Sequence, residues 1–245
     1  MDFRAYLVYV AEWMGVISVI LLLSLSLRFR IPPIGFKYPR REGTVALGLA
    51  ALLLVVAIAL YQFKVIPAMS GLSDAVAPFW LRLVAAGSAG AICMAALFVR
   101  GQPIRSMGWG RNTLGAGVRL GLALALLTIF LRGKIYALMN GVNPAEGAPL
   151  LVFLLISLAE ETAFRGYIQM RLDAWLGPRW GWLLTALLYT IFNLPRLLLN
   201  PVTFWFLLFV TVGQALVLGF LAQRSQGVLA PFLYRAISEW LVFVV

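Results

Sequence analysis

The sequence has no histidine and one cysteine, Cys93, among its 245 residues. Without histidine the chain cannot offer imidazole as a general base, a haem ligand or a metal ligand. A single thiol cannot form a disulfide within the chain, and we interpret Cys93 as a packing residue. Because zinc sites are built mainly from imidazole and thiolate ligands, these two shortages exclude a zinc site of the usual kind, and we expect no cofactor.

Charged side chains are also scarce, at 12% of residues, whereas 62% of residues are hydrophobic. These values lie far outside the averages for water-soluble domains. An apolar helix of about 20 residues crosses the ~30 Å hydrocarbon core of a bilayer, and several runs approach that length. We therefore predict an all-α fold, a polytopic transmembrane helical bundle of about eight spans, at residues 6–27, 44–63, 79–99, 113–131, 150–172, 182–194, 203–222 and 228–245.

The net charge of +11 arises from basic residues that alternate between successive loops. One set of loops holds Arg28, Arg30, Lys37, Arg40, Arg41, Arg100, Arg105, Arg111, Arg165, Arg171, Arg179 and Arg224, and the opposite set holds Arg4, Lys64, Arg132, Lys134 and Arg196. The richer side is predicted to be cytoplasmic, which places both termini on the non-cytoplasmic side. We expect a multi-pass protein, of the cytoplasmic (inner) membrane if bacterial, whose partners include anionic membrane lipids and exclude nucleic acid.

Two of the predicted spans contain one arginine each, Arg82 and Arg119, close to an end of the span. A long guanidinium side chain in such a place reaches the membrane surface while its methylene groups stay in the hydrocarbon. We therefore interpret both arginines as structural anchors.

Two adjacent carboxylates, Glu160 and Glu161, lie about ten residues into the span that begins at Leu150, at a depth of roughly 15 Å. Ionisable groups at such depth are paired or functional, because their insertion into hydrocarbon is costly. Glu161 and Arg165 are spaced i,i+4 in the favourable order, which predicts an ion pair within one helix. Glu160 points about 100° away and has no local partner.

Polar residues lie at a similar depth in two later spans. Asn193 follows Trp182 by about eleven residues, and its amide is of a kind that often hydrogen-bonds between helices. In the last span Arg235 and Glu239 are again spaced i,i+4. Three helices are therefore predicted to bring Glu160, Asn193 and the Arg235–Glu239 pair to one level of the membrane, as a site inside the bundle requires.

The string from Glu160 to Arg165 resembles the Glu-Glu-x-x-x-Arg signature of the CPBP family (Abi, or type II CAAX prenyl protease-like) of intramembrane proteases. Two later motifs of that family are present here with the same spacing but with different residue types at the key positions. Tyr189-Thr-Ile-Phe-Asn193 stands where the family has Phe-x-x-x-His. Arg235-Ala-Ile-Ser-Glu239 stands where it has His-x-x-x-Asn or His-x-x-x-Asp. The resemblance covers roughly residues 108–245.

The resemblance implies a role for each matching position. The first glutamate of active members activates a water, and the histidines and asparagine bind metal or stabilise the oxyanion. Glu160, Glu161, Arg165, Asn193, Arg235 and Glu239 are thus the candidate catalytic positions, with no metal or cofactor residues. The family's zinc site is predicted to be lost, and Arg235 would repel a hard cation held by the remaining oxygen ligands.

We divide the chain into residues 1–112, N-terminal spans without a diagnostic motif, and residues 113–245, a CPBP-like transmembrane core. The motif positions are retained, but their residue types are replaced. This favours a catalytically degenerate protein that acts as a scaffold, an assembly factor or a subunit of a membrane complex. The alternative is an active endopeptidase that uses Glu160 and Glu239 without metal. A transporter is a third hypothesis, although the sequence shows neither the inverted repeats nor the broken helices of many transporters.

Overall fold

The structure, a computed structural model, describes residues 3–24, 35–62, 77–199 and 201–244, and these ranges contain helices and no strands. The basic residues Arg28, Arg30 and Lys64 lie outside the described residues. The helices are α1 (Phe3–Ser24), α2 (Pro39–Gln62), α3 (Ala77–Val99), η2 (Ile104–Met107), α4 (Arg111–Leu131), α5 (Ile135–Met139), α6 (Pro144–Glu161), η3 (Thr162–Gln169), α7 (Met170–Leu176), α8 (Pro178–Leu198), α9 (Phe204–Ser225) and α10 (Leu229–Trp240).

Seven helical segments of the described ranges are long and apolar enough to cross a membrane, which confirms the predicted all-α transmembrane class. They are Phe3–Leu22, Pro39–Gln62, Phe79–Val99, Thr113–Leu131, Pro144–Leu176, Pro178–Leu198 and Phe204–Ser225. Together they indicate a multi-pass integral membrane protein. The segment predicted as the eighth span instead contains α10, whose 12 residues cover only about 18 Å.

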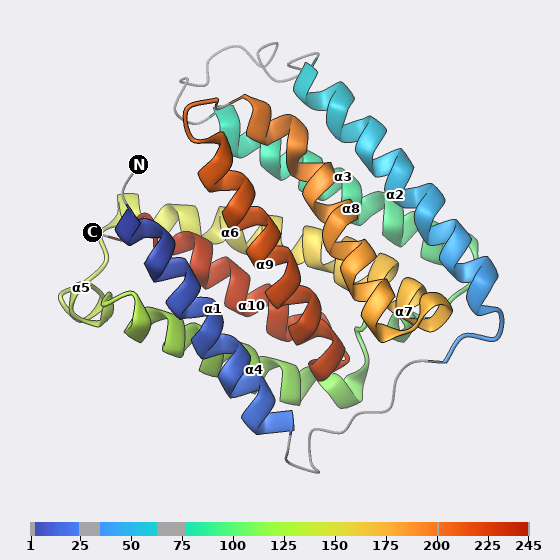
Figure 1. Cartoon of the computed structure of the whole chain (residues 1–245), viewed down its shortest axis with the longest axis horizontal. Helices are drawn as coiled ribbons and strands as arrows, with labels where there is room; N and C mark the ends of the chain where they lie inside the picture. Colours follow the sequence, from blue (N-terminus) through green and yellow to red (C-terminus); the bar gives the residue numbers. More distant parts are fainter. Residues whose placement is uncertain (1–2, 25–34, 63–76, 200, 245) are drawn as a thin grey trace.

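The short helix α10 lies inside the bundle, packed against α4, α6 and α9 (Figure 1). The α1 helix covers α4 and α9 on one flank, and α2 packs against α3, α7 and α8 on the other. Because neighbouring helices surround it, α10 can carry charged side chains that a helix facing lipid could not.

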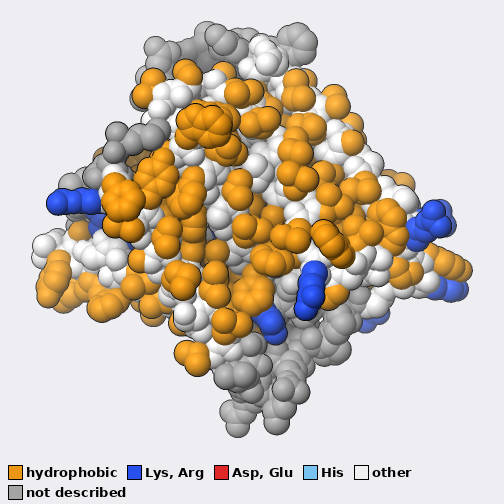
Figure 2. All heavy atoms as spheres, viewed as in Figure 1, with side chains coloured by type: hydrophobic (Ala, Val, Ile, Leu, Met, Phe, Trp, Pro, Cys, Tyr) orange, Lys and Arg blue, Asp and Glu red, His pale blue; other side chains and the backbone are white. Residues whose placement is uncertain are grey.

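Apolar side chains cover most of the face seen in Figure 2, and Lys and Arg side chains lie mainly towards its edges. Large side chains such as Leu126 on α4, Met14 on α1 and Trp205 on α9 are more than 60% exposed. Such a surface is unfavourable in water but matches hydrocarbon, so it agrees with a membrane location.

Local sequence explains where the helices of the second half begin and how closely they pack. Asn143 caps α6 in a capping box with Glu146. Gly177, at φ +85°, allows the sharp turn from α7 into Pro178, the first residue of α8. A Cβ at Gly121 of α4 would come within 2.9 Å of the Leu233 Cβ, so this glycine permits the close approach of α4 and α10.

The span that contains the two adjacent glutamates changes its winding directly after them. Residues Thr162–Gln169 form η3, a π-helix, before the chain returns to α-helical winding in α7. Wide π turns within longer helices are often found at functional sites. The widened segment is fully buried and packs closely on η2, because a Cβ at Gly166 would meet the Met107 carbonyl oxygen at 2.5 Å.

Candidate functional site

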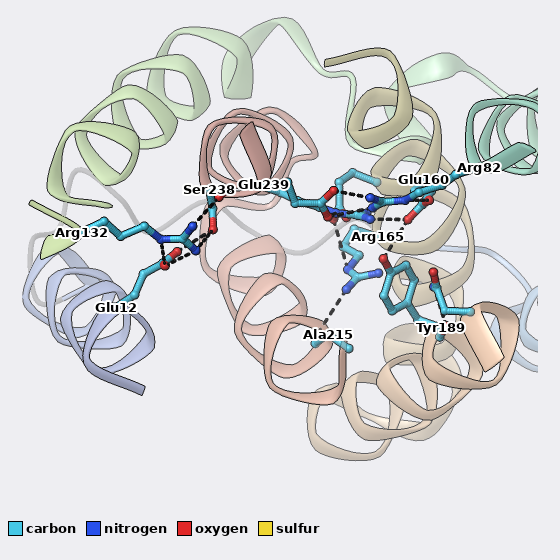
Figure 3. Close-up of polar contacts among 12 residues, drawn as sticks. Glu12, Arg82, Arg132, Glu160, Arg165, Tyr189, Ala215, Ser238 and Glu239 are labelled. Carbon is cyan, nitrogen blue, oxygen red and sulfur yellow. Dashed lines mark hydrogen bonds and ion pairs between the residues drawn. The ribbon is translucent and has the colours of Figure 1, made fainter. Parts of the chain in front are cut away.

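Arg235 of α10 is at the centre of the buried polar cluster (Figure 3). Its Nη1 donates to Glu161 Oε1 at 2.8 Å and its Nε donates to Glu239 Oε1 at 2.9 Å. Its Nη2 donates to Glu160 Oε2. The Arg235 side chain is 0% exposed, so one guanidinium binds all three carboxylates away from solvent.

A second guanidinium reaches the same carboxylates from α3. Arg82 Nη2 donates to Glu239 Oε1 at 2.8 Å, and its Nη1 forms an ion pair with Glu239 Oε2 at 2.6 Å. Its Nε lies 3.7 Å from Glu160 Oε1. The Arg82 side chain is only 10% exposed. The prediction that Arg82 extends to the membrane surface is therefore wrong, because carboxylates inside the bundle attract it more strongly than the interface does. Arg119, by contrast, is exposed on α4.

The predicted ion pair between Glu161 and Arg165 is confirmed, with 3.2 Å between Oε2 and Nε. Arg165 also donates from Nη2 to the Ala215 carbonyl oxygen of α9 at 3.3 Å (Figure 3). The cluster thus contains three carboxylates and three guanidiniums, and its formal charges balance. Balanced pairing is the condition under which such groups can be buried.

The α8 helix contributes Tyr189 to the cluster rather than Asn193. Tyr189 donates from its hydroxyl to Glu160 Oε2 at 2.8 Å. Asn193 is buried, but its Nδ2 donates to the Tyr189 carbonyl oxygen, one turn earlier in the same helix, at 3.0 Å. Asn193 therefore forms a hydrogen bond within its own helix instead of the expected bond between helices, and the longer tyrosine side chain reaches across to α6.

The donor set determines what this cluster can do chemically. Oε2 of Glu160 accepts from both Arg235 and Tyr189, so the carboxylate is held by fixed donors. A general base needs a water or substrate proton within hydrogen-bond reach of a free lone pair. The zinc that the family resemblance implies does not fit these residues, because Arg235 offers no lone pair and brings a permanent positive charge to the carboxylates.

The opposite side of α10 carries a separate polar cluster that the sequence reading missed. Glu12 of α1, which is 0% exposed, pairs with Arg132 at 2.6 Å and accepts hydrogen bonds from Tyr234 at 2.8 Å and Ser238 at 2.7 Å. Burial alone would lower the pKa of Arg132, but Glu12 and the neighbouring Tyr9 and Tyr234 side chains together outweigh burial and raise that pKa. Ser238 and Glu239 point to opposite sides of α10 in Figure 3, so α10 links the two clusters.

A third ion cluster joins α2, the residues that follow α3, and α7. Glu42 at the start of α2 pairs with Arg100 at 2.5 Å and with Arg171 at 3.2 Å. Gln102 donates to Glu42 at 3.0 Å and accepts from Arg171 at 2.5 Å. This cluster fixes the α2 end of the bundle and has no overlap with the motif positions.

The comparisons with known proteins agree with the motif reading. Residues 147–241 match the family model of type II CAAX prenyl endopeptidase Rce1-like proteins. Neither a curated protein nor a solved structure matches the chain. The matched range includes Glu160, Arg165, Asn193, Arg235 and Glu239, whereas Arg82 and Glu12 lie outside it. Residues 147–241 of this membrane protein are therefore a domain of the Rce1-like type II CAAX prenyl endopeptidase family, a family of intramembrane proteases.

Proposed function

We propose that this chain is a catalytically inactive relative of the intramembrane proteases and that it serves as a fixed scaffold, an assembly factor or a subunit within a membrane complex. The observation that supports the proposal is the contact of Arg235 with Glu160, Glu161 and Glu239. Arg235 occupies a position that the family resemblance assigns to a histidine, so a permanent cation replaces a titratable group.

The contacts of Glu160 argue against general-base catalysis. Arginine stays protonated at any usable pH, so Arg235 keeps its hold on the carboxylate throughout a catalytic cycle. A carboxylate stabilised by two guanidiniums and a phenol is a poor acceptor for the proton of water. The arrangement therefore supports a structural use of the former motif positions.

The same contacts connect four parts of the bundle. Arg82 comes from α3, Glu160 from α6, Tyr189 from α8 and Arg235 from α10. Removal of one partner from a buried ion cluster costs about 3–5 kcal/mol, because the others stay buried without compensation. A scaffold whose shape must be constant would benefit from such cross-links.

Restoration of the family motif tests the loss of catalysis. The variant Asn193→His/Arg235→His/Glu239→Asn reinstates the family's residue types, and Asn193→Gln/Arg235→Lys/Glu239→Gln is the matched control without histidine. We expect no cleavage of a prenylated membrane peptide by the wild type or the control. Zinc binding or cleavage by the restored variant alone would show that the replaced residues suppress activity, whereas cleavage by the wild type would contradict the proposal.

The scaffold role requires a partner in the membrane. Photo-crosslinking amino acids placed at the exposed positions Met14 of α1 and Leu126 of α4 would report contacts in native membranes. We expect a protein adduct of one defined size from at least one position, lost when Arg235→Gln disturbs the bundle. Adducts with lipid alone at both positions would contradict the subunit role.

A further inference from the structure

A cavity of about 780 Å³ lies outside the arginine–carboxylate contacts of Arg235, at the end of the bundle where α7 meets α8 and α9 ends. Three polar residues at four-residue spacing along η3 and α7 line it, namely Arg165, Gln169 and Asp173. Trp182, Phe220 and other apolar residues form much of the remaining wall. The cavity therefore combines a polar row with an apolar surface, as a site for an amphiphile would.

Each residue of the polar row has a buried atom without a hydrogen-bond partner. These atoms are Nη1 of Arg165, Oε1 of Gln169 and Oδ1 of Asp173. Arg165 and Gln169 are each 1% exposed, and Gln169 is held in place because its Nε2 donates to the Gly219 carbonyl oxygen at 2.8 Å. Unpartnered groups in such a place cost free energy, and a bound ligand would offset that cost.

Two cationic side chains lie at the mouth of the cavity. Arg179, at the start of α8, and Arg224, at the end of α9, line the cavity and are exposed. These two residues bring two positive charges against the single carboxylate of Asp173, while the charge of Arg165 is paired with Glu161. This end of the bundle is the side that the distribution of basic residues predicts to be cytoplasmic, where anionic headgroups attract Lys and Arg.

We propose that this cavity binds the headgroup of an anionic phospholipid that carries hydroxyl groups. The phosphate matches the guanidiniums of Arg165, Arg179 and Arg224, since guanidinium forms strong charge-assisted hydrogen bonds with phosphate. Headgroup hydroxyls supply the donors that Gln169 Oε1 and Asp173 Oδ1 lack, and the apolar wall accepts the glycerol backbone and the start of the acyl chains. The site is independent of whether the domain is catalytically active.

Native mass spectrometry of the purified chain in neutral detergent tests this proposal with dioctanoyl phosphatidylglycerol as the probe. We expect one saturable site. Dioctanoyl phosphatidylmethanol, which keeps the charge and lacks the hydroxyls, should bind about fivefold more weakly. Dioctanoyl phosphatidylcholine, which has no net charge, should bind about tenfold more weakly or not at all. Equal affinity for all three lipids would overturn the proposal, and so would equal affinity for soluble glycerol 3-phosphate, which lacks acyl chains.

Two pairs of variants locate the binding. Arg179→Gln/Arg224→Gln should weaken phosphatidylglycerol binding about tenfold. The control Arg41→Gln/Arg105→Gln removes the same charge from exposed residues at this end that do not line the cavity, and should leave affinity within twofold. Arg165→Lys and the cavity-filling Ala174→Trp should each reduce binding, with the unfolding midpoint measured on the same samples. Equal losses in both double variants would mean binding to surface charge and would refute the site.

Discussion

Glu239 Oε1 accepts two hydrogen bonds from different helices, one from Arg235 a turn earlier in α10 at 2.9 Å and one from Arg82 of α3 at 2.8 Å. Glu239 occupies the position that the family resemblance assigns to a terminal amide. Its carboxylate thus contacts two positively charged guanidinium groups. An amide could not balance two guanidiniums, so the glutamate and the arginines depend on one another.

Arg235→Gln should destabilise the bundle by about 3–5 kcal/mol, because Glu160 and Glu161 would stay buried with less compensation. Chemical denaturation in detergent measures the change. Arg119→Gln is the control, since Arg119 lies exposed on α4 and its loss should cost less than ~1 kcal/mol. Similar stability of the two variants would show that the central ion pairs contribute little.

Arg82 and Glu239 should show a large coupling in a double-mutant cycle. Arg82→Gln leaves Glu239 paired with Arg235 alone, and Glu239→Gln leaves Arg82 with only the 3.7 Å contact to Glu160. The double variant removes both charges, so we expect a coupling of about 1–3 kcal/mol. The free energies of unfolding of the four proteins give this value. A coupling near zero would mean that Arg82 extends to the membrane surface after all.

Glu12→Gln should loosen α1 from the rest of the bundle. The substitution removes the charge that holds Arg132 and weakens the bonds from Tyr234 and Ser238. Hydrogen exchange should then rise in α1 and remain low in α8, which supplies none of these three partners of Glu12. An increase spread evenly over all helices would instead indicate global destabilisation.

Gly121→Val should separate α4 from α10, because even a Cβ at this position would lie 2.9 Å from that of Leu233. The expected cost is about 1–3 kcal/mol, as is typical of overpacking. Gly115→Val on the same helix is the control, since the nearest atom to a Cβ there is Arg119 Nη2 at 4.0 Å. Equal unfolding midpoints for the two variants would contradict the close packing.

Local spacing predicted part of the site. The pair of Glu161 with Arg165 follows from an i,i+4 relationship within one helix, and composition alone revealed the transmembrane class. Depth along each span also brought Glu160, Arg235 and Glu239 to one level. These predictions needed no knowledge of which helices are neighbours.

The rest depended on tertiary packing. Arg82 and Glu239 are 157 positions apart in the chain, and Arg82 looked like an anchor because its span offered no acidic partner. Tyr189 and Asn193 share a face of α8, so periodicity could not tell which of them reaches Glu160. The enclosure of α10 by α4, α6 and α9 likewise depends on tertiary packing.

The central claim is that Arg235 holds Glu160 out of catalysis, and proteolysis in proteoliposomes tests it most directly. The wild-type chain and Glu160→Gln would each be incubated with prenylated and unprenylated membrane peptides, and products identified by mass spectrometry. The account predicts no cleavage by either protein. Cleavage by the wild type that Glu160→Gln abolishes would contradict it.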